Sequence, residues 1–195
     1  MRKILGILVL AALWAIPSMA ADFKIYGAYW DTKDAGNTFG GGLGFGIPLG
    51  ASPLSIAVSG TYFKELSDRP LRNLFNQGEN FFARNNLRVT PVEAGLQWDF
   101  MPNSNWSPWV EGGVSYYFLS NSRHGIDMNN ETGWHASVGT RIGSREGGNF
   151  FAEAIYRSAT STVRRNDLTG TTTLSDRVRL NLDGLGVNAG FLWHW

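Results

Sequence analysis

The chain ends with Asn188-Ala189-Gly190-Phe191-Leu192-Trp193-His194-Trp195, and this stretch decides its fold. Every second residue here, and in the residues just before it, is apolar. One face carries Leu185, Val187, Ala189, Phe191, Trp193 and Trp195, and the other carries Gly184, Gly186, Asn188, Gly190 and His194. A period of two residues is typical of a β-strand with one apolar and one polar face. The sequence therefore predicts a strand over 180–195.

The same alternation recurs along the chain and predicts seven more strands. They cover residues 22–31, 37–49, 53–66, 87–101, 106–120, 132–144 and 149–160. These strands are as long as, or somewhat longer than, the roughly 9 to 11 residues that a tilted strand needs to cross a bilayer. No segment has the period of a long amphipathic helix. We therefore predict an all-β fold, an eight-stranded antiparallel up-and-down transmembrane β-barrel.

The connections between the predicted strands alternate in length. Those at 50–52, 102–105 and 145–148 are tight turns, whereas 67–86, 121–131 and 161–179 are long loops. The first connection, 31–36, is the short exception on the long-loop side. An outer-membrane barrel places its short turns at the periplasmic rim and its long loops outside the cell. The alternation therefore favours this architecture.

The apolar face of each strand is expected to meet lipid. A soluble barrel that binds a ligand inside would also alternate, but its outer surface would need many charged residues. After residue 20 the chain has three lysines, Lys24, Lys33 and Lys64, and its polar faces consist largely of small residues. Small residues suit a narrow interior, so we expect the polar face to line the lumen.

Residues 1–20 are predicted to be a secretory signal peptide. Arg2 and Lys3 precede an apolar run, and Ser18-Met19-Ala20 forms a small-x-small cleavage site. The barrel domain would then cover 21–195. At the other end, Asn188, Gly190, Trp193 and Trp195 resemble the assembly signal of bacterial outer-membrane β-barrel proteins, and the chain as a whole is similar to the small OmpA-like and OmpX-like barrels. This resemblance implies outer-membrane localisation, insertion by the barrel assembly machinery, and contact with outer-membrane lipid and lipopolysaccharide.

Composition limits the remaining possibilities. The 17 Lys and Arg residues and 16 Asp and Glu residues give a net charge of +1, which becomes −1 if Arg2 and Lys3 are removed. We expect no nucleic-acid partner, because this charge creates no strong field for a polyanion. The chain has no cysteine, so neither disulfides nor thiolate metal sites can form. We expect no metal, no cofactor and a monomer.

Strand parity predicts a cluster of charged residues inside the barrel. The inward residues are Lys24, Glu93, Glu111, His135, Arg141, Glu153 and Arg157. An eight-stranded barrel is just wide enough for side chains to fill it, so we expect ion pairs that plug the lumen. The inward glycines of strand 37–49 are expected to make room for long arginine side chains. A narrow solute conduit or a proton relay is the alternative.

One trio invites an enzymatic interpretation. His135 and Ser137 share a strand face, and Glu153 on the next strand could orient the histidine. The arrangement is weakly similar to the His-x-Ser motif of outer-membrane lipid A deacylases. However, Val138 follows the serine where that family has asparagine, and parity turns the trio inward rather than toward lipid. We therefore assign no enzymatic activity, and a deacylase-like hydrolase stays an alternative.

The long loops are rich in arginine. Residues 67–86 contain Arg69, Arg72 and Arg84, and residues 161–179 contain Arg164, Arg165, Arg177 and Arg179. The arginine fork binds phosphates and sulfates in a bidentate manner, so these loops could contact lipopolysaccharide or sulfated host glycans. Solvated loop charges without a partner are an equal alternative. The predicted role is structural or interactive: envelope integrity, surface adhesion or lipopolysaccharide contact.

Overall fold

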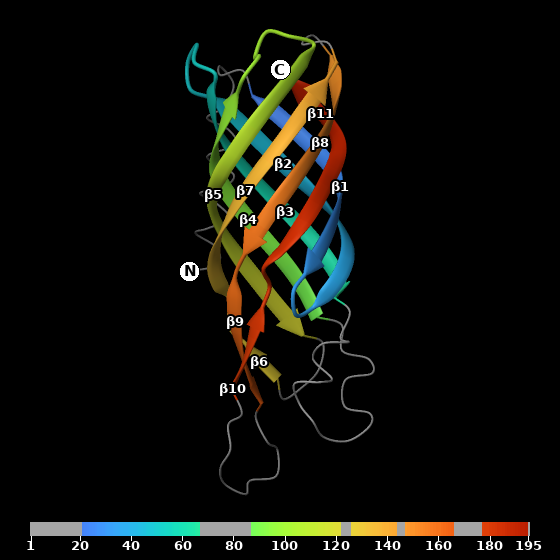
Figure 1. The fold of residues 1–195 in the computed structure, drawn as a ribbon, viewed down its shortest axis with the longest axis vertical. Coiled ribbons are helices and arrows are strands. Elements are labelled where there is room, and N and C mark those ends of the chain that lie inside the picture. Colours follow the sequence, from blue (N-terminus) through green and yellow to red (C-terminus); the bar gives the residue numbers. More distant parts are fainter. Residues whose placement is uncertain (1–20, 67–86, 122–125, 144–146, 166–176, 195) are drawn as a thin grey trace, which may run out of the picture.

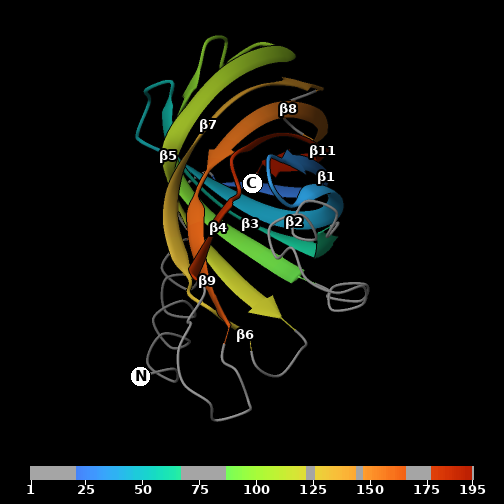
Figure 2. The ribbon, with the colours of Figure 1, turned by 60° about the horizontal axis from the view of Figure 1, so that its bottom comes forward.

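A computed structural model of the chain describes residues 21–66, 87–121, 126–143, 147–165 and 177–194. The predicted signal peptide, the 67–86 segment and Trp195 lie outside these residues. Within them, eight antiparallel strands form a closed barrel in the order β1-β11-β8-β7-β5-β4-β3-β2 (Figures 1 and 2). The barrel strands are β1 (Asp22–Thr32), β2 (Gly36–Pro48), β3 (Leu54–Leu66), β4 (Leu87–Asp99), β5 (Trp106–Asn121), β7 (Glu131–Ile142), β8 (Gly148–Ser158) and β11 (Gly184–His194). The prediction of an eight-stranded antiparallel barrel is confirmed.

Strands β1 and β11 close the barrel. Their register runs without a break from the pair Asp22–His194 to the pair Thr32–Gly184. The Asp22 carboxylate also contacts Nδ1 of the His194 ring. Closure pairs the backbone groups that an open sheet would leave at its edges, which is what a lipid environment demands.

The barrel continues beyond one rim as a small sheet that the sequence did not predict. It consists of β6 (Ile126–Met128), β9 (Thr160–Arg165) and β10 (Arg177–Asn181), in the order β10-β9-β6. Figure 1 shows it projecting from the end of the barrel at which β3, β5 and β8 end, which we call the loop rim; the opposite end is the turn rim. Much of the predicted loop 161–179, and part of the loop 121–131, is therefore strand.

The predicted strand 180–195 was wrong in its first part, because it is interrupted at Leu182 and Asp183. The Asp183 carboxylate accepts hydrogen bonds from the Ser158 hydroxyl (2.8 Å) and from the backbone N–H of Ala159 (3.0 Å). The Asp183 N–H donates to the Asn181 side chain (2.8 Å). Backbone bonds persist here, since the Leu182 N–H donates to the Ala159 oxygen (2.9 Å). The side-chain bonds of Asp183 interrupt the regular ladder, so the chain bends between the projecting sheet and the barrel.

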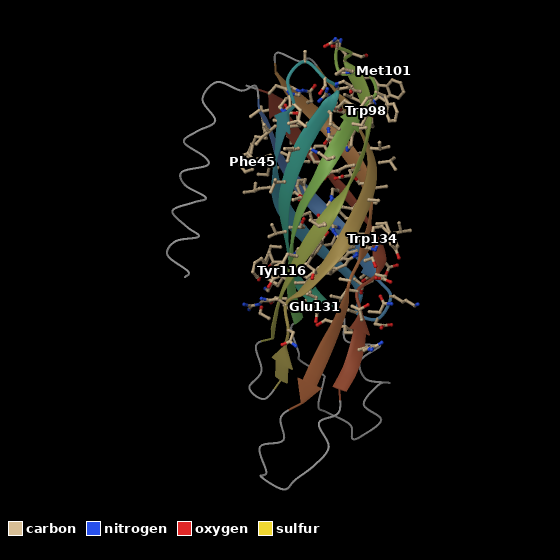
Figure 3. The ribbon with its side chains drawn as sticks, turned by 90° about the vertical axis from the view of Figure 1, so that its left-hand side faces the viewer. Phe45, Trp98, Met101, Tyr116, Glu131 and Trp134 are labelled. Carbon is tan, nitrogen blue, oxygen red and sulfur yellow. The ribbon has the colours of Figure 1, made fainter. Side chains whose placement is uncertain are left out.

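Side-chain direction follows the alternation of the sequence. Large apolar side chains are exposed all round the barrel, among them Phe39, Leu43, Leu96, Val114, Val138, Phe150 and Leu185. Trp98 lies on the outer surface toward the turn rim and Trp134 lies nearer the loop rim (Figure 3). Such rings favour the two interfaces of a bilayer, because they are apolar with one polar atom. No described residues form a helix long and apolar enough to span a membrane.

Candidate functional site

The structure places all seven charged residues selected by parity inside the barrel. Six are buried: Lys24, Glu93, His135, Arg141, Glu153 and Arg157; the side chain of Glu111 is 8% exposed. They come from five strands, β1, β4, β5, β7 and β8. Glu153 contacts Asn188, and the other six belong to three groups at different heights.

The first group lies toward the loop rim and centres on Arg157 and Glu93. Nε and Nη2 of Arg157 each donate a 2.9 Å hydrogen bond to a different Glu93 oxygen, and the side chains are 0% and 1% exposed. The guanidinium carbon also lies 5.6 Å from the centre of a Trp30 ring and 5.7 Å from that of Phe63. A bidentate pair over aromatic rings satisfies a charge that would be costly alone in this dry interior.

The second group links the pair to His135 on β7. The Ser115 hydroxyl lies 3.0 Å from Nδ1 of His135 and 3.4 Å from a Glu93 oxygen. Nε2 of His135 lies 3.3 Å from a Glu111 oxygen. Both ring nitrogens of His135 therefore contact residues of β5.

These contacts differ from the proposed catalytic trio. His135 meets Ser115 and Glu111, whereas Glu153 accepts a 3.0 Å hydrogen bond from the Asn188 amide. In the register of β7 and β8, Glu153 lies opposite Gly139, four residues from His135. The Ser137 hydroxyl is buried and has no hydrogen-bond partner among the described residues. The structure does not bring the trio together.

The third group lies toward the turn rim. Nζ of Lys24 donates to Gln97 (3.1 Å), and the Gln97 amide donates to Asp99 (3.3 Å). Arg141 lies 3.9 Å from both Asp99 and Asp22, so it joins two strands that are far apart in sequence. Lys24 also lies 4.9 Å from the centre of a Trp109 ring. Positive and negative charges alternate through this end of the lumen.

Aromatic side chains fill the lumen between the charged groups. Trp30, Phe63, Tyr117, Trp109 and Phe151 are each no more than 4% exposed. A void among the central charged residues measures about 10 Å³, roughly the space of one water molecule. Sequence reasoning missed this filling, although Trp30 shares its strand parity with Lys24 and would have revealed it. Leu192, left out of both face assignments, is also buried inward.

The inward glycines of β2 face aromatic rings rather than arginines. A Cβ atom at Gly42 would lie 2.4 Å from the Tyr26 ring, and one at Gly40 would lie 2.6 Å from the Phe63 ring. The expectation that they make room for arginine side chains was therefore wrong for these two positions. Their missing side chains allow large rings on neighbouring strands to enter the lumen.

The loop arginines divide into two sets. Arg69, Arg72 and Arg84 lie outside the described residues. Arg164 and Arg165 belong to β9, and Arg177 and Arg179 belong to β10. Arg177 is the direct register partner of Arg164, and Arg179 is the partner of Thr162. We call these two paired strands, β9 and β10, the basic ribbon.

Three residues of the predicted assembly signal are described. Asn188 is buried, with its amide on Glu153, whereas Trp193 is 38% exposed on the outer surface. A Cβ atom at Gly190 would lie 2.0 Å from the backbone oxygen of Ile25, so a side chain there would force β1 and β11 apart. These positions therefore contribute to closure of the barrel.

A closed barrel of eight antiparallel strands with an apolar outer face and a filled lumen is the architecture of small outer-membrane barrels. No protein-family model and no curated protein matches the sequence. Solved structures do match its fold. The outer membrane protein OprG from Pseudomonas aeruginosa has a TM-score of 0.69 at 15% identity over 91% of this chain and 97% of that one.

Two further structures match at similar coverage. Neisserial surface protein A has a TM-score of 0.62 at 14% identity, over 90% of this chain and 97% of that one. The outer membrane protein AlkL has a TM-score of 0.57 at 12% identity, over 91% and 90% of the two chains. The chain has the fold of these eight-stranded outer-membrane barrels, as its sequence resemblance implied.

Proposed function

We propose that this protein is an integral outer-membrane barrel whose lumen is structural and whose basic ribbon binds anionic glycans at the cell surface. Membrane residence is supported by the outer surface, where the large apolar side chains are exposed. In water such a surface would drive association, whereas lipid solvates it.

A structural lumen is supported by how completely it is filled. Arg157, Glu93, Trp30 and Phe63 close the section toward the loop rim, and each is at most 1% exposed. A conduit would need these residues to move together and would break the bidentate pair. The hydrolase alternative lacks support in the contacts, since the Ser137 hydroxyl has no hydrogen-bond partner in the part of the chain that the structure describes.

The observation that carries the glycan proposal is the register of β9 and β10. Four arginines fall within two strands of six and five residues, and two of them, Arg164 and Arg177, are direct partners. On its other side Arg164 has Asp127 of β6 as its register partner, so the sheet pairs one acidic residue with the four arginines. Like charges at paired positions destabilise a ribbon unless anions neutralise them, and one acidic residue does not balance four arginines. A phosphate or sulfate group supplies that anion and can bind two guanidinium groups at once.

The test measures binding of two anionic glycans to the refolded full barrel. They are heparin and the polysaccharide part of lipopolysaccharide, released from its lipid. Neutralising Arg164, Arg165, Arg177 and Arg179 to Gln is expected to weaken binding at least about tenfold, because each charge-assisted bond adds roughly 1.5–3 kcal/mol. The matched control neutralises Arg69, Arg72 and Arg84 and is expected to retain binding. Binding that survives the ribbon substitutions, or is lost only in the control, would show that the ribbon is not the site. Membrane fractionation of expressing cells tests residence separately.

A further inference from the structure

The outer wall of the barrel contains a groove that the lumen and the basic ribbon do not explain. It has a volume of about 710 Å³ and crosses β1, β2, β3 and β4. Its apolar lining includes Leu43, Phe45, Val58, Tyr62 and Val92. We call it the wall groove. Phe45 marks its end toward the turn rim (Figure 3).

Two glycines create the hollow. Gly60 lies between its register partners Leu43 and Val92, whereas Gly41 lies between Tyr62 and a further glycine, Gly27. A Cβ atom at Gly41 would come no nearer than 3.6 Å to the described atoms beyond its chain neighbours, and one at Gly60 no nearer than 4.0 Å. The space that side chains at Gly41 and Gly60 would occupy is therefore open among the described residues.

The groove extends along β3 as well as across the four strands. From Val58 to Tyr62 it covers five residues of β3, four steps of roughly 3.3 Å or about 13 Å. Leu43 and Val58 are 49% and 41% exposed, so the walls are apolar surface that solvent or lipid must cover. The shape and chemistry suit one flexible hydrocarbon chain.

Two cations stand at the end of the groove nearer the loop rim. Phe63 and Val89 are register partners and point inward. Lys64 and Arg88 are the next residues toward the loop rim on β3 and β4, and both are exposed. They lie just beyond Tyr62 and Thr90, which line the groove. A lipid whose tail fills the groove would place its headgroup beside these two side chains.

We propose that the wall groove holds one acyl chain of a phosphorylated glycolipid of the outer leaflet, of the lipid A type, whose phosphate binds Lys64 and Arg88. This inference rests on the proposed residence in the outer membrane. Arginine and lysine at the interface attract anionic headgroups, and arginine binds phosphate in a bidentate manner. The tail gains apolar contacts in the hollow that a flat barrel wall does not offer.

A second copy of the barrel fits the groove less well. A two-fold dimer in a membrane has its axis along the bilayer normal, so it would bring the Lys64 and Arg88 of both copies to the same height. The two Arg88 side chains would then approach each other at the rim, where repulsion opposes contact. An anionic lipid converts the same charges into attraction.

The experiment counts the lipids that stay bound to the refolded full barrel by native mass spectrometry, with lipid A as the probe. Dephosphorylated lipid A and phosphatidylglycerol are the comparison lipids. Gly41→Leu with Gly60→Leu fills the groove, and its matched control, Ala154→Leu, enlarges an exposed side chain on the opposite wall. Lys64→Gln with Arg88→Gln removes the headgroup contacts, and Lys33→Gln removes an exposed charge at the same rim.

One lipid A is expected to bind tightly to the unmodified barrel, and less tightly without its phosphates. The groove-filling pair and the cation pair should each weaken that site about tenfold or more, in line with the loss of two buried methylenes or of one charge-assisted bond. Ala154→Leu and Lys33→Gln should keep it. Heat-modifiable migration in gels confirms that each variant is folded, which the open space at both glycines leads us to expect.

Three outcomes would overturn the proposal. The first is equal retention of lipid A by all folded variants. The second is a groove that prefers phosphatidylglycerol, or is indifferent to phosphate and to the cation pair. The third is cross-linking of two barrels through the groove that the leucine pair abolishes. Heparin binding by the same variants is expected to stay unchanged, so the lipid proposal for the wall groove can fail independently of the glycan proposal for the basic ribbon. Membrane fractionation tests the proposed residence in the outer membrane separately.

Discussion

Replacing Glu93 by leucine would test the charged lumen most directly. The change removes the carboxylate that receives two 2.9 Å bonds from Arg157 and keeps a side chain of similar volume. Arg157 is fully buried, and its Nη1 atom already has no hydrogen-bond partner among the described residues. Without Glu93 the guanidinium would keep its aromatic contacts but lose its counter-charge. We expect the free energy of unfolding to fall by about 3–5 kcal/mol, the usual cost of an uncompensated buried charge.

The assay is urea unfolding of the barrel in phospholipid vesicles, followed by tryptophan fluorescence and by gel mobility. Coincident transitions by the two probes justify a two-state free energy. The double variant Glu93→Leu with Arg157→Met removes both charges and is expected to recover most of the loss, since apolar replacement of a whole buried pair is often close to neutral. Asp31→Asn, at an exposed position, is the control and should stay within about 0.5 kcal/mol of the unmodified protein.

Two results would refute this reasoning. If Glu93→Leu changed the unfolding free energy by less than about 1 kcal/mol, Arg157 would have to be compensated by other groups or by water. If the double variant were as unstable as the single one, packing rather than charge would explain the loss.

Three further predictions concern the lumen and the wall. Ser137→Ala should change the unfolding free energy by less than about 1 kcal/mol, because the hydroxyl has no hydrogen-bond partner among the described residues. Mass spectrometry should find lipid A intact after incubation with this variant and with the unmodified protein. Acyl-chain release by the unmodified protein that stops in the variant would reinstate the hydrolase. Gly113→Ala should destabilise by about 1–3 kcal/mol in the same urea assay, because its Cβ would lie 2.1 Å from the Ala94 oxygen, whereas Gly27→Ala, with no atom within 4 Å, should be nearly neutral. Planar bilayers should record no stable pore from the unmodified barrel, and a reproducible channel would contradict the filled lumen.

The sequence predicts the barrel well because alternation reports directly on strand direction and face. Counting from Trp195 fixes the faces of the last strand, and matching the apolar alternation within each other strand assigns Glu93, Arg157 and Lys24 to the lumen without knowledge of any contact. The count does not say which residues meet, because that depends on the stagger between neighbouring strands. His135 therefore contacts Ser115 and Glu111 instead of Ser137 and Glu153.

The projecting sheet escaped prediction for a different reason. Residues 160–165 and 177–181 are short, polar and rich in threonine and arginine, so they carry little apolar alternation. Their pairing depends on the bend at Asp183, whose bonds to Ser158 and Ala159 are tertiary contacts. Alternation alone could not locate that bend inside a run of residues that otherwise resembles one strand.

The seam between β1 and β11 also has a consequence for the order of folding. Asp22 and His194 are separated by 172 positions, so this pairing closes the longest loop in the barrel. Contacts this distant in sequence form late, because chain entropy opposes them until nearer hairpins have restricted the ends. The other strand neighbours can assemble hairpin by hairpin, but the cylinder exists only once this final ladder forms. We therefore expect pairing of β1 with β11 to be the last step of folding. A chain that mispairs there exposes two unsatisfied strand edges at once.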